Sequence, residues 1–150
     1  MVLGLLGGLF EKDIEIVAGS KYSYYTVNDL RINFGGYGTD IPYADCNNIP
    51  AAMKVVVPCD GVYTCNCGAR TMDTSLYCRI RIYDASGTTV LQEGPETYQQ
   101  YGDTTFSSIP TNFTLKKGQI IVGAVRSTSI QNIYGGYYMA LNVTFDLSFK

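Results

Sequence analysis

The C-terminal stretch YYMALNVTFDLSFK, residues 137–150, has a large apolar side chain at every second position, with polar residues between them from Asn142 onwards. Successive side chains of a β-strand point to opposite faces of a sheet, so the alternation predicts a strand with one buried face. The apolar row consists of Tyr137, Met139, Leu141, Val143, Phe145, Leu147 and Phe149. At about 1.5–3 kcal/mol for each large side chain removed from water, the row contributes on the order of 10 kcal/mol gross, which fixes its register. The fold must therefore supply a second apolar layer opposite this strand.

Shorter stretches upstream show the same alternation or are rich in β-branched residues. We predict strands at residues 13–17, around 30–34, and at 53–57, 62–69, 76–83, 88–91, 112–115 and 119–125. The stretch 119–125 is apolar at nearly every position, which predicts a strand buried on both faces. Residues 35–50, 92–108 and 127–136 are rich in turn-forming residues, so we expect surface loops there, the second of them around one short strand.

The composition agrees with an all-β fold. The chain has 150 residues, with 16 Gly, 13 Tyr, only 16% charged residues and no Trp or His. A chain of this length can bury a core of its own, and a weakly charged sequence rich in Tyr and Gly favours strands and tight turns over amphipathic helices. We therefore predict one domain at residues 13–150, an antiparallel β-sandwich of about eight strands. Residues 1–12 form an apolar N-terminal extension.

Three motifs resemble, in their order and turn chemistry, those of jelly rolls of the C1q and tumour-necrosis-factor type. They are VVVPCDGVY at residues 55–63, RIRIYDASG at 79–87 and LKKGQI at 115–120. The same module occurs in head-decoration, head-fibre and tail-fibre proteins of tailed bacteriophages, and the resemblance covers about the last hundred residues. It implies an antiparallel jelly-roll β-sandwich that forms a homotrimer. The implied function is that of a non-enzymatic virion structural protein, a capsid decoration or head-fibre subunit.

The first ten residues, MVLGLLGGLF, are apolar on every side but contain three glycines, so a solitary helix would be unstable in water. The segment needs an apolar surface, either this protein's own core or a neighbouring subunit. We expect the second, a docking contact with the major capsid protein or another virion protein. The side chains expected to make it are Val2, Leu3, Leu5, Leu6, Leu9 and Phe10.

The same segment has no basic residues and no small-residue cleavage site, and it is too short to span a bilayer. We therefore expect the protein to be made and kept in the cytoplasm, with no membrane span. The family resemblance implies that this is the cytoplasm of a host cell and that the protein then resides in the virion. The formal net charge is -2, and basic residues cluster only at Lys116, Lys117 and the Arg79, Arg81 pair. Such a surface cannot neutralise many phosphates, so nucleic acid is not an expected partner.

The absence of histidine removes the usual general base and the commonest zinc ligand. We expect Asp60, Asp84 and Asp103 to cap turns, and we predict no enzymatic activity and no cofactor. The five cysteines are Cys46, Cys59, Cys65, Cys67 and Cys78. Cys65 and Cys67 alternate on one face of a predicted strand, unlike the knuckles that bind zinc, so we predict buried free thiols and no metal. A cross-strand disulfide such as Cys67 with Cys78 is an alternative, which would require an oxidising environment.

Tyrosines are frequent in the segments predicted as loops, including residues 22–25. Tyrosine offers a large amphipathic surface at low entropic cost, so these residues are candidates for a sugar-binding platform or a protein interface. The loop residues singled out are Tyr37, Tyr43, Tyr98, Tyr101 and Tyr134. They support one alternative function, a module that binds carbohydrate or a receptor on a phage fibre, with surface glycans as partner. A second alternative, a secreted C1q-like domain, rests on the family resemblance.

Overall fold

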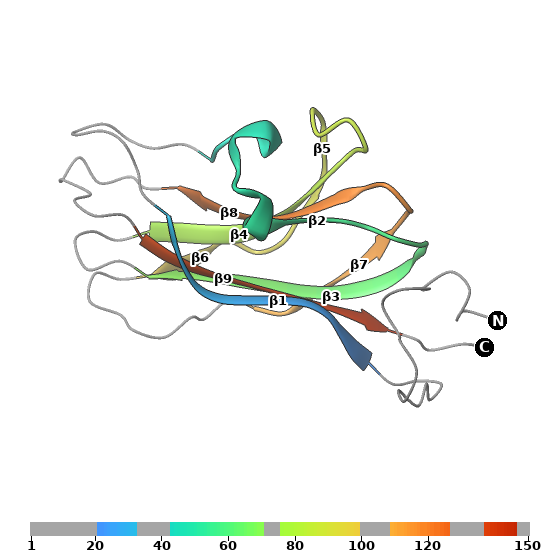
Figure 1. The fold of residues 1–150 in the computed structure, drawn as a ribbon, viewed down its shortest axis with the longest axis horizontal. Coiled ribbons are helices and arrows are strands. Elements are labelled where there is room, and N and C mark those ends of the chain that lie inside the picture. Colours follow the sequence, from blue (N-terminus) through green and yellow to red (C-terminus); the bar gives the residue numbers. More distant parts are fainter. Residues whose placement is uncertain (1–20, 33–42, 71–75, 100–108, 127–136, 147–150) are drawn as a thin grey trace.

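The computed structural model describes residues 21–32, 43–70, 76–99, 109–126 and 137–146, which form nine strands and two short 3-10 turns. Two antiparallel sheets pack face to face (Figure 1). The first sheet has the order β1 (Lys21–Ile32), β9 (Tyr137–Asp146), β3 (Gly61–Arg70) and β7 (Thr111–Leu115). The second has the order β2 (Lys54–Val56), β8 (Ile120–Arg126), β4 (Leu76–Tyr83) and β5 (Val90–Glu93), and β6 (Thr97–Gln99) also pairs with β4. The prediction of an all-β sandwich is confirmed.

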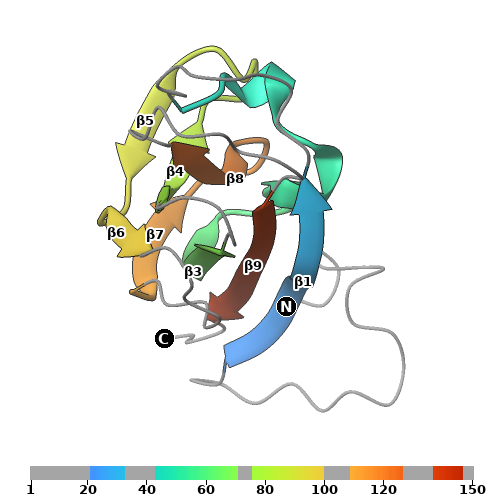
Figure 2. The same cartoon turned by 90° about the vertical axis from the view of Figure 1, so that its left-hand side faces the viewer.

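The strand pairs are nested along the chain. β1 pairs with β9, β2 with β8, β3 with β7, and β4 with both β5 and β6, all antiparallel. Alternate pairs belong to opposite sheets, so the chain behaves as one long antiparallel ribbon folded over on itself. Figure 2 shows the two layers from the end, with the Cys46–Asn48 turn on the side of the second sheet that faces away from the first.

The terminal strand has the predicted buried face. β9 lies between β1 and β3, where Val143 is opposite Cys65 and Phe145 is opposite Tyr63. Met139, Leu141, Val143 and Phe145 are all buried, while Asn142 and Thr144 are half-buried. The side chain of Tyr137 and residues 147–150 lie outside the described residues. The alternation is therefore confirmed from residue 141 to residue 145, whereas Ala140, on the other face of the strand, is also buried.

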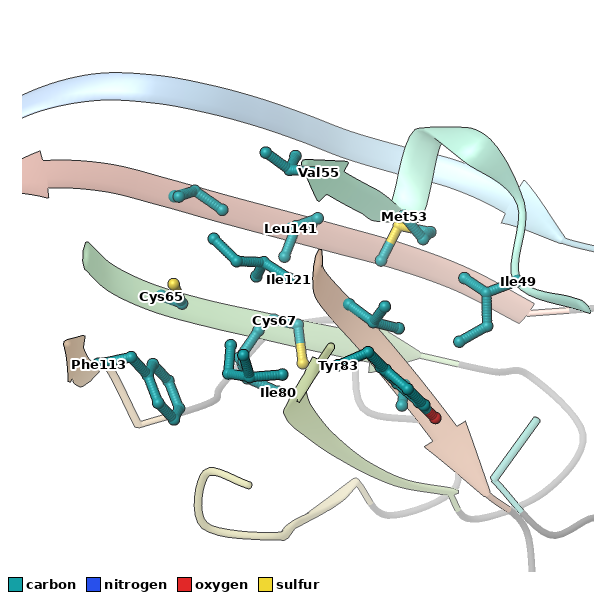
Figure 3. Close-up of a cluster of buried hydrophobic side chains, with 14 of the residues drawn as sticks. Ile49, Met53, Val55, Cys65, Cys67, Ile80, Tyr83, Phe113, Ile121 and Leu141 are labelled. Atoms are coloured by element: carbon teal, nitrogen blue, oxygen red, sulfur yellow. The ribbon is translucent and has the colours of Figure 1, made fainter. Parts of the chain in front are cut away.

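The core fills the space between the sheets (Figure 3). At its centre the sheets approach closely, because β8 has a glycine there. A Cβ added to Gly123 would lie 2.7 Å from the Cε of Met53 and 3.3 Å from the Cβ of Cys67. A larger residue at this position would push the two layers apart.

Most predicted strands are confirmed, with shifted ends. β4 has the predicted bounds, and β3, β5, β7 and β8 lie within three residues of theirs. β8 is buried on both faces, as expected: Ile121 and Val125 face the other sheet, and Val122 and Ala124 are buried on the outer side. The short strand within residues 92–108 is β6.

Two expectations are wrong and one is revised. Residues 22–25 lie in the strand β1, not in a loop; register shifts at Ser23/Tyr25 and Val27/Leu30 interrupt the period of two and hide this strand in the sequence. Within the predicted surface loop at residues 35–50, Cys46 and Ile49 are buried and Cys46–Asn48 forms a 3-10 turn. The strand predicted at residues 53–57 is shorter, because Ala51–Met53 forms another 3-10 turn. The predicted strand at residues 13–17 and the docking segment lie outside the described residues.

Candidate functional site

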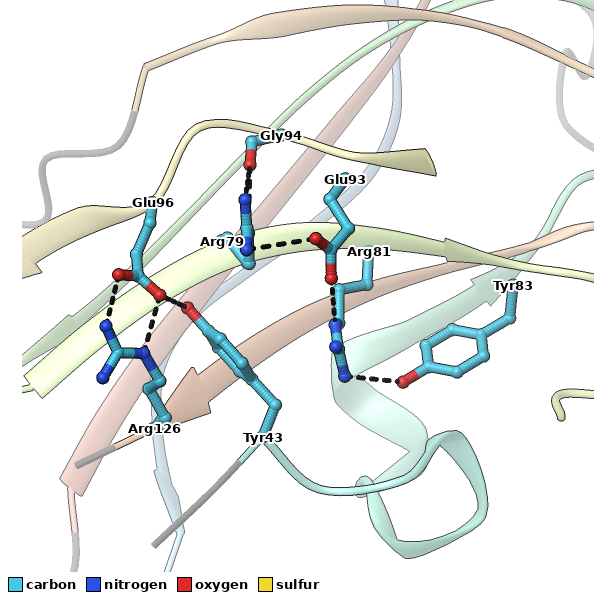
Figure 4. A network of polar contacts seen from close by, with 8 residues as sticks. All are labelled: Tyr43, Arg79, Arg81, Tyr83, Glu93, Gly94, Glu96 and Arg126. Atoms are coloured by element: carbon cyan, nitrogen blue, oxygen red, sulfur yellow. Dashed lines mark hydrogen bonds and ion pairs between the residues drawn. The ribbon is translucent and has the colours of Figure 1, made fainter. Parts of the chain in front are cut away.

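The outer face of the second sheet carries a cluster of charged and aromatic side chains. In β4 the alternation buries Leu76, Cys78, Ile80 and Ile82 and turns Tyr77, Arg79, Arg81 and Tyr83 to the outer side. Pairing with β8 sets Arg126 beside Tyr77, and the incoming segment brings Tyr43 over the arginines. We name this group the Arg/Tyr cluster; its members are Tyr43, Tyr77, Arg79, Arg81, Glu93, Glu96, Tyr98 and Arg126. Figure 4 draws all of them except Tyr77 and Tyr98.

Glu96 is the centre of one half of the cluster. Arg126 donates from Nε to Glu96 Oε2 at 2.7 Å and from Nη2 to Oε1, and the hydroxyl of Tyr43 donates to Oε2 at 2.6 Å. The hydrogen bond from Arg126 lowers the pKa of Glu96 to about 2. Burial, followed by the hydrogen bond to Glu96, raises the pKa of Tyr43, so its phenol stays protonated. At neutral pH this half is an ion pair with a neutral phenol as third partner.

The other half of the cluster ties β4 to β5. Arg79 donates from Nε and Nη2 to the carbonyl of Gly94 at 3.0 and 2.9 Å, and its Nη1 lies 3.1 Å from Glu93. Arg81 donates to Glu93 at 2.8 Å and to the hydroxyl of Tyr83 at 3.2 Å. These charge-assisted bonds hold both guanidinium groups in fixed positions.

The ring of Tyr43 lies among three cations. The guanidinium carbon of Arg81 is 4.9 Å from the ring centroid, and those of Arg79 and Arg126 are each 5.9 Å away. Cation–π attraction and the bond to Glu96 therefore anchor the segment that enters β2 on the outer face of the sheet. Tyr43 is half-buried and engaged in this structural contact, contrary to the expectation that it is an available loop residue.

An aromatic surface borders the cluster. The rings of Tyr77 and Tyr98 are 5.0 Å apart between centroids and tilted by 53°, and Arg126 lies 4.1 Å from the centroid of Tyr77. Tyr98 is 51% exposed, and it belongs to β6 and not to a loop. This arrangement offers a ring face to the solvent beside a carboxylate and a guanidinium.

Of the five loop tyrosines singled out in the sequence, Tyr43 and Tyr98 have described positions. Tyr43 and Tyr98 reach the same arginine, Arg126, the second of them through Tyr77. Tyr37, Tyr101 and Tyr134 lie outside the described residues. Glu96 and Arg126 were not recognised in the sequence, because each lies near the end of its own segment. The sequence feature that could have indicated the cluster is the alternation of Tyr77, Arg79, Arg81 and Tyr83. It predicts an outer sheet face rich in hydrogen-bond donors and aromatic rings.

The turn aspartates have the predicted role. Asp84 accepts from the backbone N–H groups of Thr88 and Thr89 at 3.0 and 3.2 Å, which lowers its pKa. Asp60 accepts from the N–H of Lys117 at 2.8 Å, the main cause of its lowered pKa, and from the ammonium of Lys116 at 3.2 Å. Asp103 lies outside the described residues.

All five cysteines are buried and free, as predicted. Burial raises the pKa of Cys65 to about 12. Among the residues with described positions, no group of three or more His, Cys, Asp or Glu side chains could hold a metal ion. Within the same ranges, no helix has the length and apolar character needed to cross a membrane.

No protein-family model matches the sequence, and no curated protein matches it. The function is therefore argued from the strand order, the turns and the outer face of the second sheet.

Proposed function

We propose that this protein is a non-enzymatic structural subunit of a bacteriophage particle, built on a jelly roll and acting in capsid decoration or a head fibre. The observation that carries the proposal is the nested strand order. A jelly roll has eight strands in two sheets, and β5 and β6 count as one interrupted strand because both pair with β4. The first strand then pairs with the eighth, the second with the seventh, the third with the sixth and the fourth with the fifth.

The turns named in the family resemblance also meet in space. The N–H of Gly118 donates to the carbonyl of Val57 at 2.9 Å, and Asp60 binds the N–H of Lys117, which joins the first motif to the third. A Cβ added to Gly118 would lie 3.7 Å from the Cβ of Ala85 in the second motif. The turns of the three motifs therefore contact one another, which is a physical reason for the motifs to occur together.

An exposed edge supports a role in assembly. All four residues of β5 are exposed, and this strand carries Val90 and Leu91 at the edge of the second sheet. Apolar side chains on an edge strand favour pairing with another chain. We propose a homotrimer that contacts the major capsid protein or another virion protein, with residues 1–12 as the docking segment.

The test combines mass and particle binding. The purified protein is expected to sediment with three times the mass of one chain and to bind empty capsid shells. A truncated protein that starts at Glu11 should keep its β-sheet circular dichroism and melting temperature but lose shell binding. A monomer that fails to bind shells would contradict the proposal, and a truncated protein that still binds would remove the docking role from residues 1–12.

A second candidate function is carbohydrate binding, and the exposed Tyr98 ring favours it. Sugar rings stack on aromatic faces while polar groups bind their hydroxyls. The ring of Tyr98 packs against that of Tyr77, and Arg126 contacts Tyr77 and forms an ion pair with Glu96. The isolated protein would then bind specific members of a glycan array. Tyr98→Ala should abolish that binding, whereas the matched control Tyr98→Phe keeps the ring and should retain most of it. Capture by capsid shells without any glycan binding favours the first function.

A further inference from the structure

Two cysteine thiols face each other across the core. Cys67 belongs to β3 in the first sheet and Cys78 to β4 in the second, and both are fully buried, at 1% and 0% exposure. Their thiols interact directly, and the Sγ of Cys78 lies 3.9 Å from the carbonyl oxygen of Cys67. Figure 3 shows Cys67 in the layer between the two sheets.

The sheets are unusually close at this point. Face-to-face sheets are about 10 Å apart, whereas a disulfide needs Cβ atoms about 3.5–4.5 Å apart. Next to the pair, a Cβ on Gly123 of β8 would lie only 3.3 Å from the Cβ of Cys67. Gly123 is paired with Ile80, which lies two residues from Cys78 on the same inner face of β4. The two sheets therefore approach closely next to the cysteine pair, as a bond between them requires.

The other three cysteines have different neighbours from those of Cys67 and Cys78. Cys59 contacts the hydroxyl of Tyr63 at 3.5 Å, and Cys46 lies against Gly87 with its carbonyl bonded to Lys54. Cys65 is on the same face of the same strand as Cys67, two residues away, so these two thiols lie side by side along β3 and do not link the sheets.

We propose that Cys67 and Cys78 are a modification site that closes into a disulfide between the two sheets when a small-molecule disulfide reaches them. The thiolate of one cysteine attacks the oxidant and releases one thiol, which leaves a mixed disulfide. The second thiolate then displaces the other oxidant thiol. The two cysteines lose two electrons and two protons in total, and one oxidant molecule is reduced to two thiols.

The electrostatics support Cys78 as the first nucleophile. Its interaction with the thiol of Cys67 lowers the pKa of Cys78, while the same interaction and burial raise the pKa of Cys67. The thiolate is the reactive form. Because both sulfur atoms are buried, the oxidant reaches them during folding or when β4 opens locally, so we expect slow closure in the native protein.

The experiment refolds the reduced full chain in a buffer of reduced and oxidised glutathione, blocks the remaining thiols with N-ethylmaleimide after denaturation, and counts them by mass. Three blocked thiols are expected out of five cysteines, with a peptide that joins Cys67 to Cys78. Closure of this short loop should raise the melting temperature by roughly 6–12 °C, and a thiol reductant should reverse the shift.

Single substitutions by alanine test the assignment. Cys67→Ala and Cys78→Ala should each prevent the bond, and the matched control Cys65→Ala should still form it. All three should fold, because alanine replaces a buried thiol without a new polar group; Cys65→Ala carries the test even if the other two variants fold poorly. Five blocked thiols in the oxidised wild type, or a peptide that joins any other pair, would overturn the proposal.

Discussion

The two faces of β4 differ in burial and in chemistry: the inner face is fully buried, and the outer face is only partly covered. The inner face, Leu76, Cys78, Ile80 and Ile82, is apolar and needs only a layer of matching shape. The charged outer face needs specific partners: Glu93 forms ion pairs with Arg79 and Arg81, and the ring of Tyr43 lies against both guanidinium groups. Damage to the inner layer should therefore unfold the domain, whereas damage to the outer cluster should release the segment anchored by Tyr43. The predictions below test this difference.

The largest effect is expected in the inner layer. Val143→Asp places an unpaired charge between the sheets, where Val143 is fully buried, and should destabilise the fold by roughly 4 kcal/mol or more. Soluble yield and thermal unfolding measure the loss. The control Asn142→Asp changes the adjacent, half-buried position and should cost about 1 kcal/mol or less. Equal losses would show that the faces of β9 are assigned wrongly.

A smaller effect is expected from crowding in the same layer. Gly123→Ala should lower the free energy of unfolding by about 1–3 kcal/mol, because the new methyl group meets Met53 and Cys67. Gly94→Ala is the control, since its Cβ would lie at an ordinary 3.4 Å from the ring of Phe113. Chemical denaturation measures both, and an unchanged midpoint for Gly123→Ala would contradict the close approach of the sheets.

The outer face should respond more weakly and with a dependence on pH. Glu96→Gln removes the charge bound by Arg126, and both side chains are about a quarter exposed (26% and 28%), so we expect a loss of about 1 kcal/mol. Glu96 has its pKa lowered to about 2 from an ordinary 4.5, so its contribution is complete above pH 4.5 and is lost as the pH falls towards 2.

Melting curves of the wild type and Glu96→Gln should therefore converge between pH 4.5 and 2. Lys116→Met is the control, because its ion pair with Asp60 is highly exposed and should contribute little. A difference between wild type and Glu96→Gln that persists at pH 2 would exclude the ionised carboxylate as its cause.

The smallest effect is expected for Tyr43→Phe. The variant keeps the ring among the three arginines and loses only the hydrogen bond to Glu96, which should cost about 0.5–1 kcal/mol. Limited proteolysis near residue 43 should become faster before the global melting temperature changes. A fall in melting temperature as large as that of Gly123→Ala would mean that the outer face contributes to the whole fold in the same way as the core.

The same contrast explains what the sequence could predict. Local alternation is enough for β4 and β9, whose large apolar side chains repeat with a period of two along the buried face. Of β1, only residues 30–32 fall within a predicted strand, and residues 21–29 were missed because register shifts break that period. The buried Cys46 and Ile49 were missed because turn residues surround them. The Arg/Tyr cluster depends on pairing, because Tyr43, Glu96 and Arg126 come from three separate segments. The pairing of β8 with β4 places Arg126, the pairing of β6 with β4 places the neighbouring Glu96, and Tyr43 then binds Glu96.

The pairing of β1 with β9 also sets the order of events in folding. Lys21 pairs with Asp146, and β9 separates β1 from β3, so β1 has no described sheet neighbour until residues 137–146 have been synthesised. Non-local pairings of this kind make folding slow, in milliseconds to seconds, and leave unpaired strand edges exposed meanwhile. β1 therefore emerges from the ribosome long before its partner strand, and its backbone hydrogen-bonding groups have no strand partner in the meantime.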